Sequence, residues 1–213
     1  MTTTPVARPY DPLVHLVDDE APVRDALAFL FQSHGLPVRT YSNGPDFLAA
    51  ADHDDLAGCI LLDVRMEPMS GLQVHDALVA RGIGVPVLFL TGHGDIPMAV
   101  EALKKGAFDF VEKPSGDEAL VERVQRALAV DAARQAAHSR DEETAARLAS
   151  LSEREREVMQ RVAAGKLNKV IADELCISVR TVEVHRARVF GKLGVRSAAE
   201  VATMLARTRP GPP

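Results

Sequence analysis

Between residues 13 and 128, short apolar runs alternate five times with segments of helical spacing, and this alternation constrains the fold more than any other feature. The apolar runs lie at 13–17, 37–41, 58–63, 85–90 and 107–111. Each run is too short for a helix and is bounded by Gly, Pro, Asn or Asp, which is typical of strands. Five strand–helix units predict a five-stranded parallel sheet, doubly wound in the flavodoxin-like order, with helices on both faces.

The rest of the chain lacks strand signals. Residues 128–148 are rich in Ala, Arg and Glu and contain neither Pro nor Gly, so they predict a helical linker that continues the fifth helix. Beyond it, helical spacing predicts an all-α unit with four short helices, at 152–164, 168–175, 179–193 and 197–207. The expected organisation is a disordered tail at 1–12, a first domain at 13–128, a linker at 129–148, a second domain at 149–208 and a disordered tail at 209–213.

Charge is unevenly distributed along the chain. The whole chain has 25 Lys and Arg against 30 Asp and Glu, but residues 149–213 hold 12 of the basic and only 7 of the acidic residues. The C-terminal part therefore carries a net charge of +5 and the part before it a net charge of −10. This asymmetry favours two domains with different partners, and nucleic acid is the candidate partner of the basic one.

Several classes of protein are disfavoured. No apolar run approaches the ~18–20 residues of a membrane helix, and the N-terminus has no apolar signal segment, so we expect a cytoplasmic protein without a membrane partner. The seven histidines show no metal-ligand spacing. Cys59 and Cys176 are outside any ligand or redox motif, and we expect both to be reduced and buried.

Charged and polar residues stand where the predicted strands end. Asp18 and Asp19 follow the first strand, Asp63 ends the third, Thr91 follows the fourth, and Lys113 follows the fifth. Because the carboxyl ends of parallel strands meet at one edge of a doubly wound sheet, these five side chains are expected to lie close together.

Clustered carboxylates beside an ammonium group suit phosphoryl transfer. A hard divalent cation, for which Mg²⁺ is the best candidate, would hold the carboxylates together and neutralise an incoming phosphoryl group. Asp63 is the candidate nucleophile, and Lys113 and Thr91 would contact phosphoryl oxygens. An acidic site for a sugar or nucleotide is the alternative, although neither glycine-rich phosphate-binding motif is present.

Several segments resemble the receiver domain of response regulators, especially the FixJ type. They are VDDE (17–20), LLDVRM (61–66), MSG (69–71) and FLTGHGDIPMAVEALKKGAFDFVEKP (89–114). The resemblance spans 13–128 and implies that Asp63 is the phosphoacceptor. It also implies a Mg²⁺ site made of Asp18, Asp19, Asp63 and the backbone carbonyl of Arg65. Thr91 and Lys113 match the switch hydroxyl and the lysine of the family, and Phe110 stands at its aromatic switch position.

One position departs from the family pattern. Receivers of this type usually have Pro four residues after the phosphoacceptor, whereas this chain has Glu67 there, followed by Pro68. The change adds a carboxylate beside the predicted pocket. We therefore expect Glu67 to weaken access of the phosphodonor or to alter the affinity for Mg²⁺.

The C-terminal part has the signals of a helix-turn-helix. Ser152 begins a capping-box pattern, and Ser178 is expected to cap a helix rich in Arg after a short turn. The residues expected to face the interior are Leu151, Val158, Val162, Val170, Ile171, Leu175, Val182, Val189 and Leu193. The segments LSERE (151–155), NKVIADEL (168–175) and RTVEVHRARVFGKLGV (180–195) resemble the LuxR-type output domain.

That resemblance implies a DNA-binding surface. Residues expected to face phosphates are Asn168, Lys169, Thr181, His185, Arg188 and Lys192, and Arg180 is also expected to contact DNA. Glu183, Val184 and Arg186 would face base edges in the major groove.

Together the two resemblances imply a transcription factor switched by phosphorylation. A sensor histidine kinase would phosphorylate Asp63, Thr91 and Phe110 would move, and dimerisation through the fourth helix, fifth strand and fifth helix would pair two output domains on double-stranded promoter DNA. RNA polymerase is a further candidate partner. The only catalysis expected is the receiver's own phosphoryl transfer and dephosphorylation. Two alternatives remain open: a dimeric transcription factor independent of phosphorylation, and a metal-dependent phosphotransferase or phosphatase for free substrates.

Overall fold

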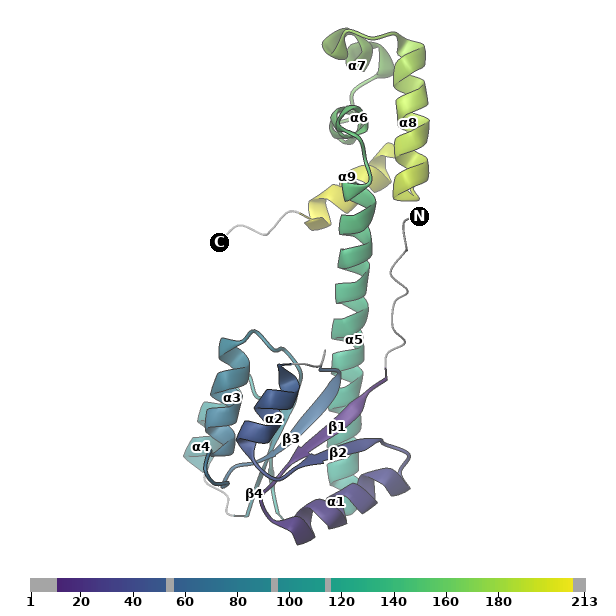
Figure 1. The fold of residues 1–213 in the computed structure, drawn as a ribbon. Coiled ribbons are helices and arrows are strands. Elements are labelled where there is room, and N and C mark those ends of the chain that lie inside the picture. The colour runs from purple at the N-terminus through teal and green to yellow at the C-terminus, as the bar shows by residue number, and fades with distance from the viewer. Residues whose placement is uncertain (1–10, 53–55, 93–95, 114–115, 209–213) are drawn as a thin grey trace. The chain divides into compact units, whose positions relative to one another are not determined.

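The computed structural model describes residues 11–52, 56–92, 96–113 and 116–208 (Figure 1). The chain divides into two compact units, Met1–Ala136 and Ala137–Pro213. The predicted tails lie outside the described residues, except for residues 11 and 12. No helix in the described parts of the chain is long and apolar enough to cross a membrane.

The first unit contains the predicted five-stranded parallel sheet. Its strands are β1 (Leu13–Val17), β2 (Val38–Tyr41), β3 (Gly58–Asp63), β4 (Val87–Thr91) and β5 (Asp109–Glu112), in the order β2-β1-β3-β4-β5. The fold prediction is therefore confirmed. β4 and β5 each begin two residues later than predicted. Pro86 lacks an N–H group and cannot donate to a ladder, and the N–H of Ala107 is used to close the preceding helix on the carbonyl of Ala102, at 3.0 Å.

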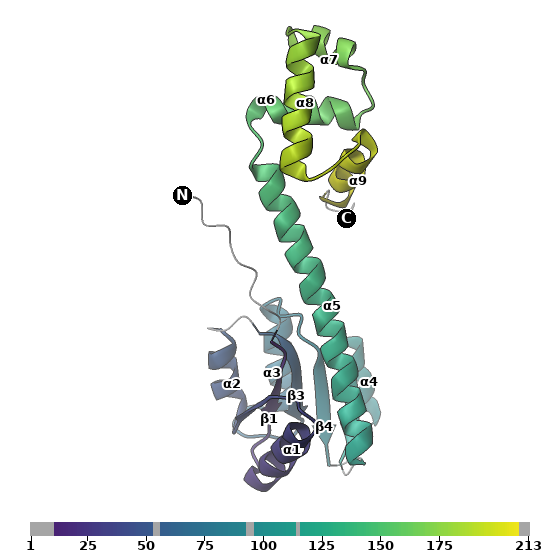
Figure 2. The ribbon, with the colours of Figure 1, turned by 90° about the vertical axis from the view of Figure 1, so that its right-hand side faces the viewer.

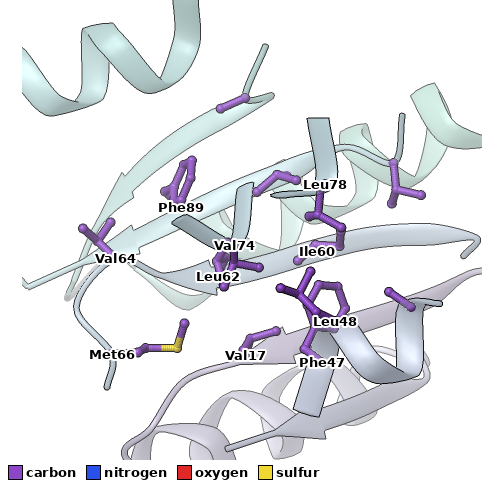
Figure 3. Packing of buried hydrophobic residues seen from close by; sticks show 14 of the residues in the cluster. Val17, Phe47, Leu48, Ile60, Leu62, Val64, Met66, Val74, Leu78 and Phe89 are labelled. Carbon is purple, nitrogen blue, oxygen red and sulfur yellow. The ribbon is translucent and has the colours of Figure 1, made fainter. Parts of the chain in front are cut away.

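Helices cover both faces of the sheet (Figures 1 and 2). They are α1 (Ala21–Ser33), α2 (Gly44–Ala51), α3 (Gly71–Ala80), α4 (Ile96–Lys104) and α5 (Asp117–Ala149). Strand residues alternate between two cores. Leu61 and Leu88 belong to the core under α1 and α5, whereas Ile60 and Phe89 belong to the core under α2, α3 and α4. Figure 3 shows the second core, in which Phe47, Val74 and Leu78 pack on the sheet. This two-sided burial fixes the strand register and so fixes which residues end at the carboxyl edge.

Helix α5 is continuous through the segment predicted as a linker. Its early part supplies Leu120, Val124 and Leu128 to the core of the first unit. Asp131, which is fully buried, accepts a hydrogen bond from the Gly58 N–H at 2.7 Å and pairs with Arg134 at 2.7 Å. Helix α5 is therefore anchored to the start of β3 one turn beyond the predicted end of the first domain.

The second unit is helical, as predicted. It contains α6 (Glu153–Ala163), α7 (Asn168–Leu175), α8 (Val179–Leu193) and α9 (Ala198–Thr208). The Ser152 capping box is complete, because Ser152 accepts from the Glu155 N–H while Glu155 accepts from the Ser152 N–H. Ser178 accepts from the Thr181 N–H at 3.1 Å and caps α8. The described interior contains every residue predicted to face it except Val170, which is 42% exposed; Ala172 is buried from α7 instead.

The two cysteines differ in their surroundings. Both are free thiols, as predicted, but only Cys59 is buried. Burial raises the pKa of the Cys59 thiol to about 12, and the nearby Asp131 carboxylate adds to the effect, so this thiol is inert at neutral pH. The prediction that Cys176 is buried was wrong. Cys176 occupies the turn between α7 and α8 in the left-handed conformation, with φ of 52°, and its side chain is exposed.

Candidate functional site

The carboxyl edge of the sheet brings together Asp18, Asp63 and Lys113, which are far apart in the sequence. The Lys113 ammonium donates to Asp18 Oδ2 and to Asp63 Oδ1, both at 2.7 Å. Asp18 is fully buried and Asp63 is 7% exposed. Lys113 therefore bridges two carboxylates at the edge where the sequence predicted a pocket.

The bridge shifts the proton affinities of its members. Burial raises the pKa of the Asp63 carboxyl, and this effect outweighs the lowering by the hydrogen bond and charge of Lys113. Burial alone would lower the pKa of the Lys113 ammonium, but its hydrogen bonds to Asp18 and Asp63 outweigh burial and raise the pKa. The two short hydrogen bonds of the bridge require a cationic Lys113 and at least one ionised carboxylate.

Backbone groups hold the Asp63 carboxylate in place. The Arg65 N–H donates to Asp63 Oδ2 at 2.9 Å, so each carboxylate oxygen has its own donor. Helix α3 begins at Gly71, whose backbone N–H bonds the Val64 carbonyl at 3.0 Å. A Cβ at Gly71 would lie 2.1 Å from the Asp63 carbonyl oxygen, so only glycine permits this close approach.

Of the predicted switch residues, Thr91 lies next to this bridge, and Phe110 lies on β5 three residues before Lys113. Thr91 is buried at the end of β4, one residue beyond the Leu90 that pairs with Asp63. The Lys113 N–H donates to the Thr91 carbonyl at 2.6 Å, which fixes the ends of β4 and β5 relative to each other. Phe110 is half-buried and packs on Phe89, with ring centroids 6.0 Å apart. In this structure the Phe110 ring therefore contacts the core under α2, α3 and α4.

The side chains suit an oxygen-liganded cation, although they do not form a closed cage for one. No group of three or more His, Cys, Asp or Glu side chains is gathered around a metal position within the described ranges. Asp18 and Asp63 lie together, whereas Asp19 is exposed and lines an open depression next to them. Mg²⁺ commonly uses only one or two protein carboxylates and completes its shell with water and phosphate. The donor set therefore fits Mg²⁺ in its chemistry.

Helix α8 presents a continuous outward face in the second unit. Val182, Val189 and Leu193 point into the interior, whereas the opposite side of the helix is exposed. The exposed residues of α8 are Val179, Arg180, Glu183, Val184, Ala187, Arg188, Gly191 and Lys192. Val184 of this helix is 44% exposed. Lys169 of α7 is also exposed.

Other residues predicted to contact DNA make contacts within the unit. Arg186 donates to the Asn168 side chain at 2.6 Å and lies over the Phe190 ring, 5.4 Å from its centroid. Lys192 donates to the Ser150 carbonyl at 3.0 Å and to the Glu155 carboxylate at 2.6 Å. Thr181 and His185 are half-buried, and the Thr181 hydroxyl bonds that of Ser178 at 2.8 Å. The sequence does not indicate these contacts, because the two partners of a contact lie up to 42 residues apart along the chain.

Glu155 makes the second unit sensitive to acid. The hydrogen bond from Lys192, with one from the Ser152 N–H, lowers the pKa of the Glu155 carboxyl from 4.5 to about 2. A carboxyl group whose pKa is lowered in the folded state contributes stability above pH 4.5, and this contribution is lost as pH falls toward 2. Lys192 is 40% exposed, so solvent screens the pair and we expect a contribution of about 2 kcal/mol.

Glu155→Gln is therefore expected to remove this pH dependence. Urea unfolding of the second unit, followed by far-ultraviolet circular dichroism, should show a smaller loss of stability between about pH 5 and about pH 3 in the variant than in the original chain. Glu153→Gln is the matched control, since Glu153 lies in the same helical turn and is exposed. Equal losses in Glu155→Gln and the original chain would contradict the assignment.

A receiver-like sheet with this carboxylate–lysine edge, in one chain with a helix-turn-helix unit, defines the class of two-component response regulators. Residues 14–125 match the family described as response regulator receiver domain, and residues 149–205 match that described as bacterial regulatory proteins, luxR family. The chain belongs to the response regulators that join these two domains, a group that includes FixJ.

Relatives and solved structures agree with this membership. The chain is 53% identical over 193 residues to the C4-dicarboxylate transport transcriptional regulatory protein DctR of Rhodobacter capsulatus, covering 90% of this chain and 98% of DctR. It is 45% identical to FixJ of Rhizobium meliloti, covering 91% of this chain and 95% of FixJ. The structure of the response regulator StyR matches with a TM-score of 0.84 and 38% identity, covering 92% of this chain and 98% of StyR. The chain is thus a DNA-binding regulator of transcription, and its receiver implies a histidine kinase as partner.

Proposed function

We propose that phosphorylation of Asp63 by a sensor histidine kinase switches this regulator into a dimer that binds two half-sites of promoter DNA. The observation that carries the proposal is the Lys113 bridge between Asp18 and Asp63, at 2.7 Å to each carboxylate. It supplies a nucleophile, a cation for a phosphoryl oxygen and a second carboxylate for a metal ion at one edge of the sheet.

Each residue of the site has a proposed role. Asp63 attacks phosphorus through one carboxylate oxygen while the Arg65 N–H holds the other. Lys113 then exchanges part of its contact with Asp63 for a phosphoryl oxygen, and Thr91 donates its hydroxyl to another. Asp18, Asp19, Asp63 and the Arg65 carbonyl are the proposed holders of Mg²⁺. The ion would neutralise charge on the phosphoryl group. The same residues are the basis for the proposed self-catalysed transfer and dephosphorylation.

The proposed dimer uses α4, β5 and α5. Val100 and Leu103 of α4 are 44% and 45% exposed, which gives this face an apolar component. Asp109 of β5 and Arg123 of α5 pair at 2.5 Å beside it, a charged contact that a change at Phe110 could rearrange. A two-fold dimer would match two DNA half-sites. RNA polymerase remains a candidate partner on the promoter.

We propose that the outward face of α8 reads DNA in the major groove. Glu183 and Val184 are exposed and free to meet a cytosine amino group and a thymine methyl group. Arg180, Arg188 and Lys169 are exposed and would position the helix on phosphates, with Asn168, Thr181 and His185 at its edge. Arg186 and Lys192 would have to give up their internal contacts to bind DNA, so their predicted contacts depend on rearrangement.

Glu183→Ala is expected to change which DNA sequences the protein selects. Selection from a random duplex pool should show a relaxed preference at one base pair per half-site, equivalent to about a tenfold loss of discrimination. Glu174→Ala serves as the control, because Glu174 lies on α7 and pairs with Lys166 and Arg161. An unchanged consensus with Glu183→Ala would count against the proposed face.

Detection of an acyl-phosphate tests the phosphorylation step. The original chain, incubated with acetyl phosphate and Mg²⁺, should gain one phosphoryl group that hydroxylamine removes. Asp63→Ala should gain none. Labelling of Asp63→Ala equal to that of the original chain, or no labelling of either, would reject the proposal and favour the regulator that acts without phosphorylation.

A further inference from the structure

An open depression of about 550 Å³ lies beside the proposed phosphorylation site. Four of its lining residues, Val64, Met66, Leu72 and Met98, are apolar, and we refer to them together as its floor. Val64 and Met66 are almost fully buried, and both also line the depression. A floor of aliphatic and thioether groups favours a small, uncharged, flat group over a hydrated ion.

The depression adjoins the backbone that follows Asp63, because Val64 and Arg65 are among its lining residues. Arg65, whose backbone N–H holds Asp63 Oδ2 at 2.9 Å, lines it, and so does Asp19, the neighbour of Asp18. In phosphoryl transfer the leaving group lies roughly in line with the attacking oxygen, on the far side of phosphorus. A donor whose phosphorus meets Asp63 therefore directs its leaving group outward, toward the surface on which this depression opens.

The lining of the depression is acidic at Glu67. This residue is exposed and joins Asp19 in the lining, and its carboxylate has no hydrogen bond or ion pair with any described residue. Arg65 is the basic residue of the lining, and no ion pair joins its side chain to Glu67 in the described parts of the chain. The Glu67 charge is therefore available to a group that enters the depression.

We propose that the depression is the subsite for the leaving group of the phosphodonor, and that Glu67 makes it selective for imidazole over carboxylate leaving groups. The inference rests on the proposed phosphorylation of Asp63. With a phosphoimidazole protonated on its second nitrogen, an Asp63 oxygen bonds to phosphorus, the P–N bond breaks, and its electron pair returns to nitrogen to give neutral imidazole. Glu67 stabilises the cationic ring that reacts, and the apolar floor receives the ring.

With an acyl phosphate, the leaving group is an anion instead of a neutral ring. The Asp63 oxygen bonds to phosphorus, the bond between phosphorus and the acyl oxygen breaks, and a carboxylate leaves with a negative charge. Glu67 repels that charge as it develops, whereas the charge of Asp19 is assigned to Mg²⁺. Interactions between exposed charges are weak, so one carboxylate is expected to change each rate on the order of threefold.

Glu67→Gln tests the subsite with two small donors, acetyl phosphate and phosphoimidazole, each with Mg²⁺ in excess. The variant should react about threefold faster with acetyl phosphate and about threefold more slowly with phosphoimidazole, so the ratio of the two rates changes by about tenfold. Glu122→Gln is the matched control, because Glu122 is exposed on α5 and its removal changes the net charge equally. Its ratio should equal that of the original chain.

Met98→Ala tests the floor independently. It should slow the reaction with phosphoimidazole and leave the rate with acetyl phosphate nearly unchanged, because only the ring packs on the thioether.

If Glu67 acted instead by altering the affinity for Mg²⁺, the rates with both donors would change in the same direction and by the same factor. A ratio unchanged in Glu67→Gln would overturn the subsite. Failure of both donors to label the original chain would instead overturn the proposed phosphorylation of Asp63.

Discussion

Lys113→Ala is expected to lower the rate at which acetyl phosphate phosphorylates Asp63 by about 100-fold. The substitution removes the ammonium that bridges Asp18 and Asp63, at 2.7 Å to each. A charged donor aimed at the phosphoryl oxygens is lost, and with it the hydrogen bond that lowers the pKa of Asp63. That pKa should therefore rise further, which leaves less of the nucleophilic carboxylate at a given pH.

The rate is measured from acyl-phosphate formation at several pH values. Lys105→Ala is the control, because Lys105 is an exposed lysine of the same unit that pairs with Asp76 at 2.9 Å, away from the edge of the sheet. Its rate should be within about twofold of the original. Since Asp18 is fully buried, Lys113→Ala must also be shown to be folded. A folded Lys113→Ala variant with an unchanged rate would contradict the role given to Lys113.

Asp131→Ala is expected to destabilise the first unit by about 3 kcal/mol. Asp131 is fully buried, and its carboxylate accepts from the Gly58 N–H at 2.7 Å and pairs with Arg134 at 2.7 Å. Alanine would leave the buried N–H without an acceptor and Arg134 without its partner. No side chain at position 58 could fill the space left by Asp131, because a Cβ there would lie 2.0 Å from the Leu13 carbonyl oxygen.

Tyrosine fluorescence during urea unfolding measures this effect. Tyr41 lies in β2 of the first unit and the sequence of the second unit contains no tyrosine, so the change in fluorescence reports on the first unit. Asp131→Asn keeps an oxygen that can accept from Gly58 and should cost less than Asp131→Ala. Glu122→Ala, an exposed position on the same helix, should change stability by less than about 0.5 kcal/mol. If the urea midpoint of Asp131→Ala equalled that of the original chain, Asp131 would not anchor α5 to β3 as inferred.

The carboxyl edge of the sheet could be predicted because its geometry follows from topology. Once five parallel strands are recognised, the residues that end them must meet, and Asp18, Asp63 and Lys113 do meet. The helices of the second unit were predicted for a different reason. Their caps and apolar spacing are local signals, and the capping box of Ser152 forms as its sequence indicates.

Contacts between distant polar residues could not be predicted in this way. Gly58 and Asp131 are 73 positions apart and no sequence pattern pairs them, and an acidic residue on a helical linker is usually exposed. The same holds for Arg186, which the resemblance to the LuxR-type output domain placed at base edges but whose side chain bonds Asn168. The exposure of Cys176 also depended on a left-handed turn that its residue type does not favour.

The central claim is that phosphorylation of Asp63 controls DNA binding. The most direct measurement is the affinity of the full chain for a selected two-half-site duplex at fixed salt, with and without acetyl phosphate, beside Asp63→Asn. The account predicts that acetyl phosphate increases the affinity of the original chain at least about tenfold and leaves that of Asp63→Asn unchanged. Equal affinities of the original chain in both conditions, under which Asp63 is shown to be phosphorylated, would contradict it.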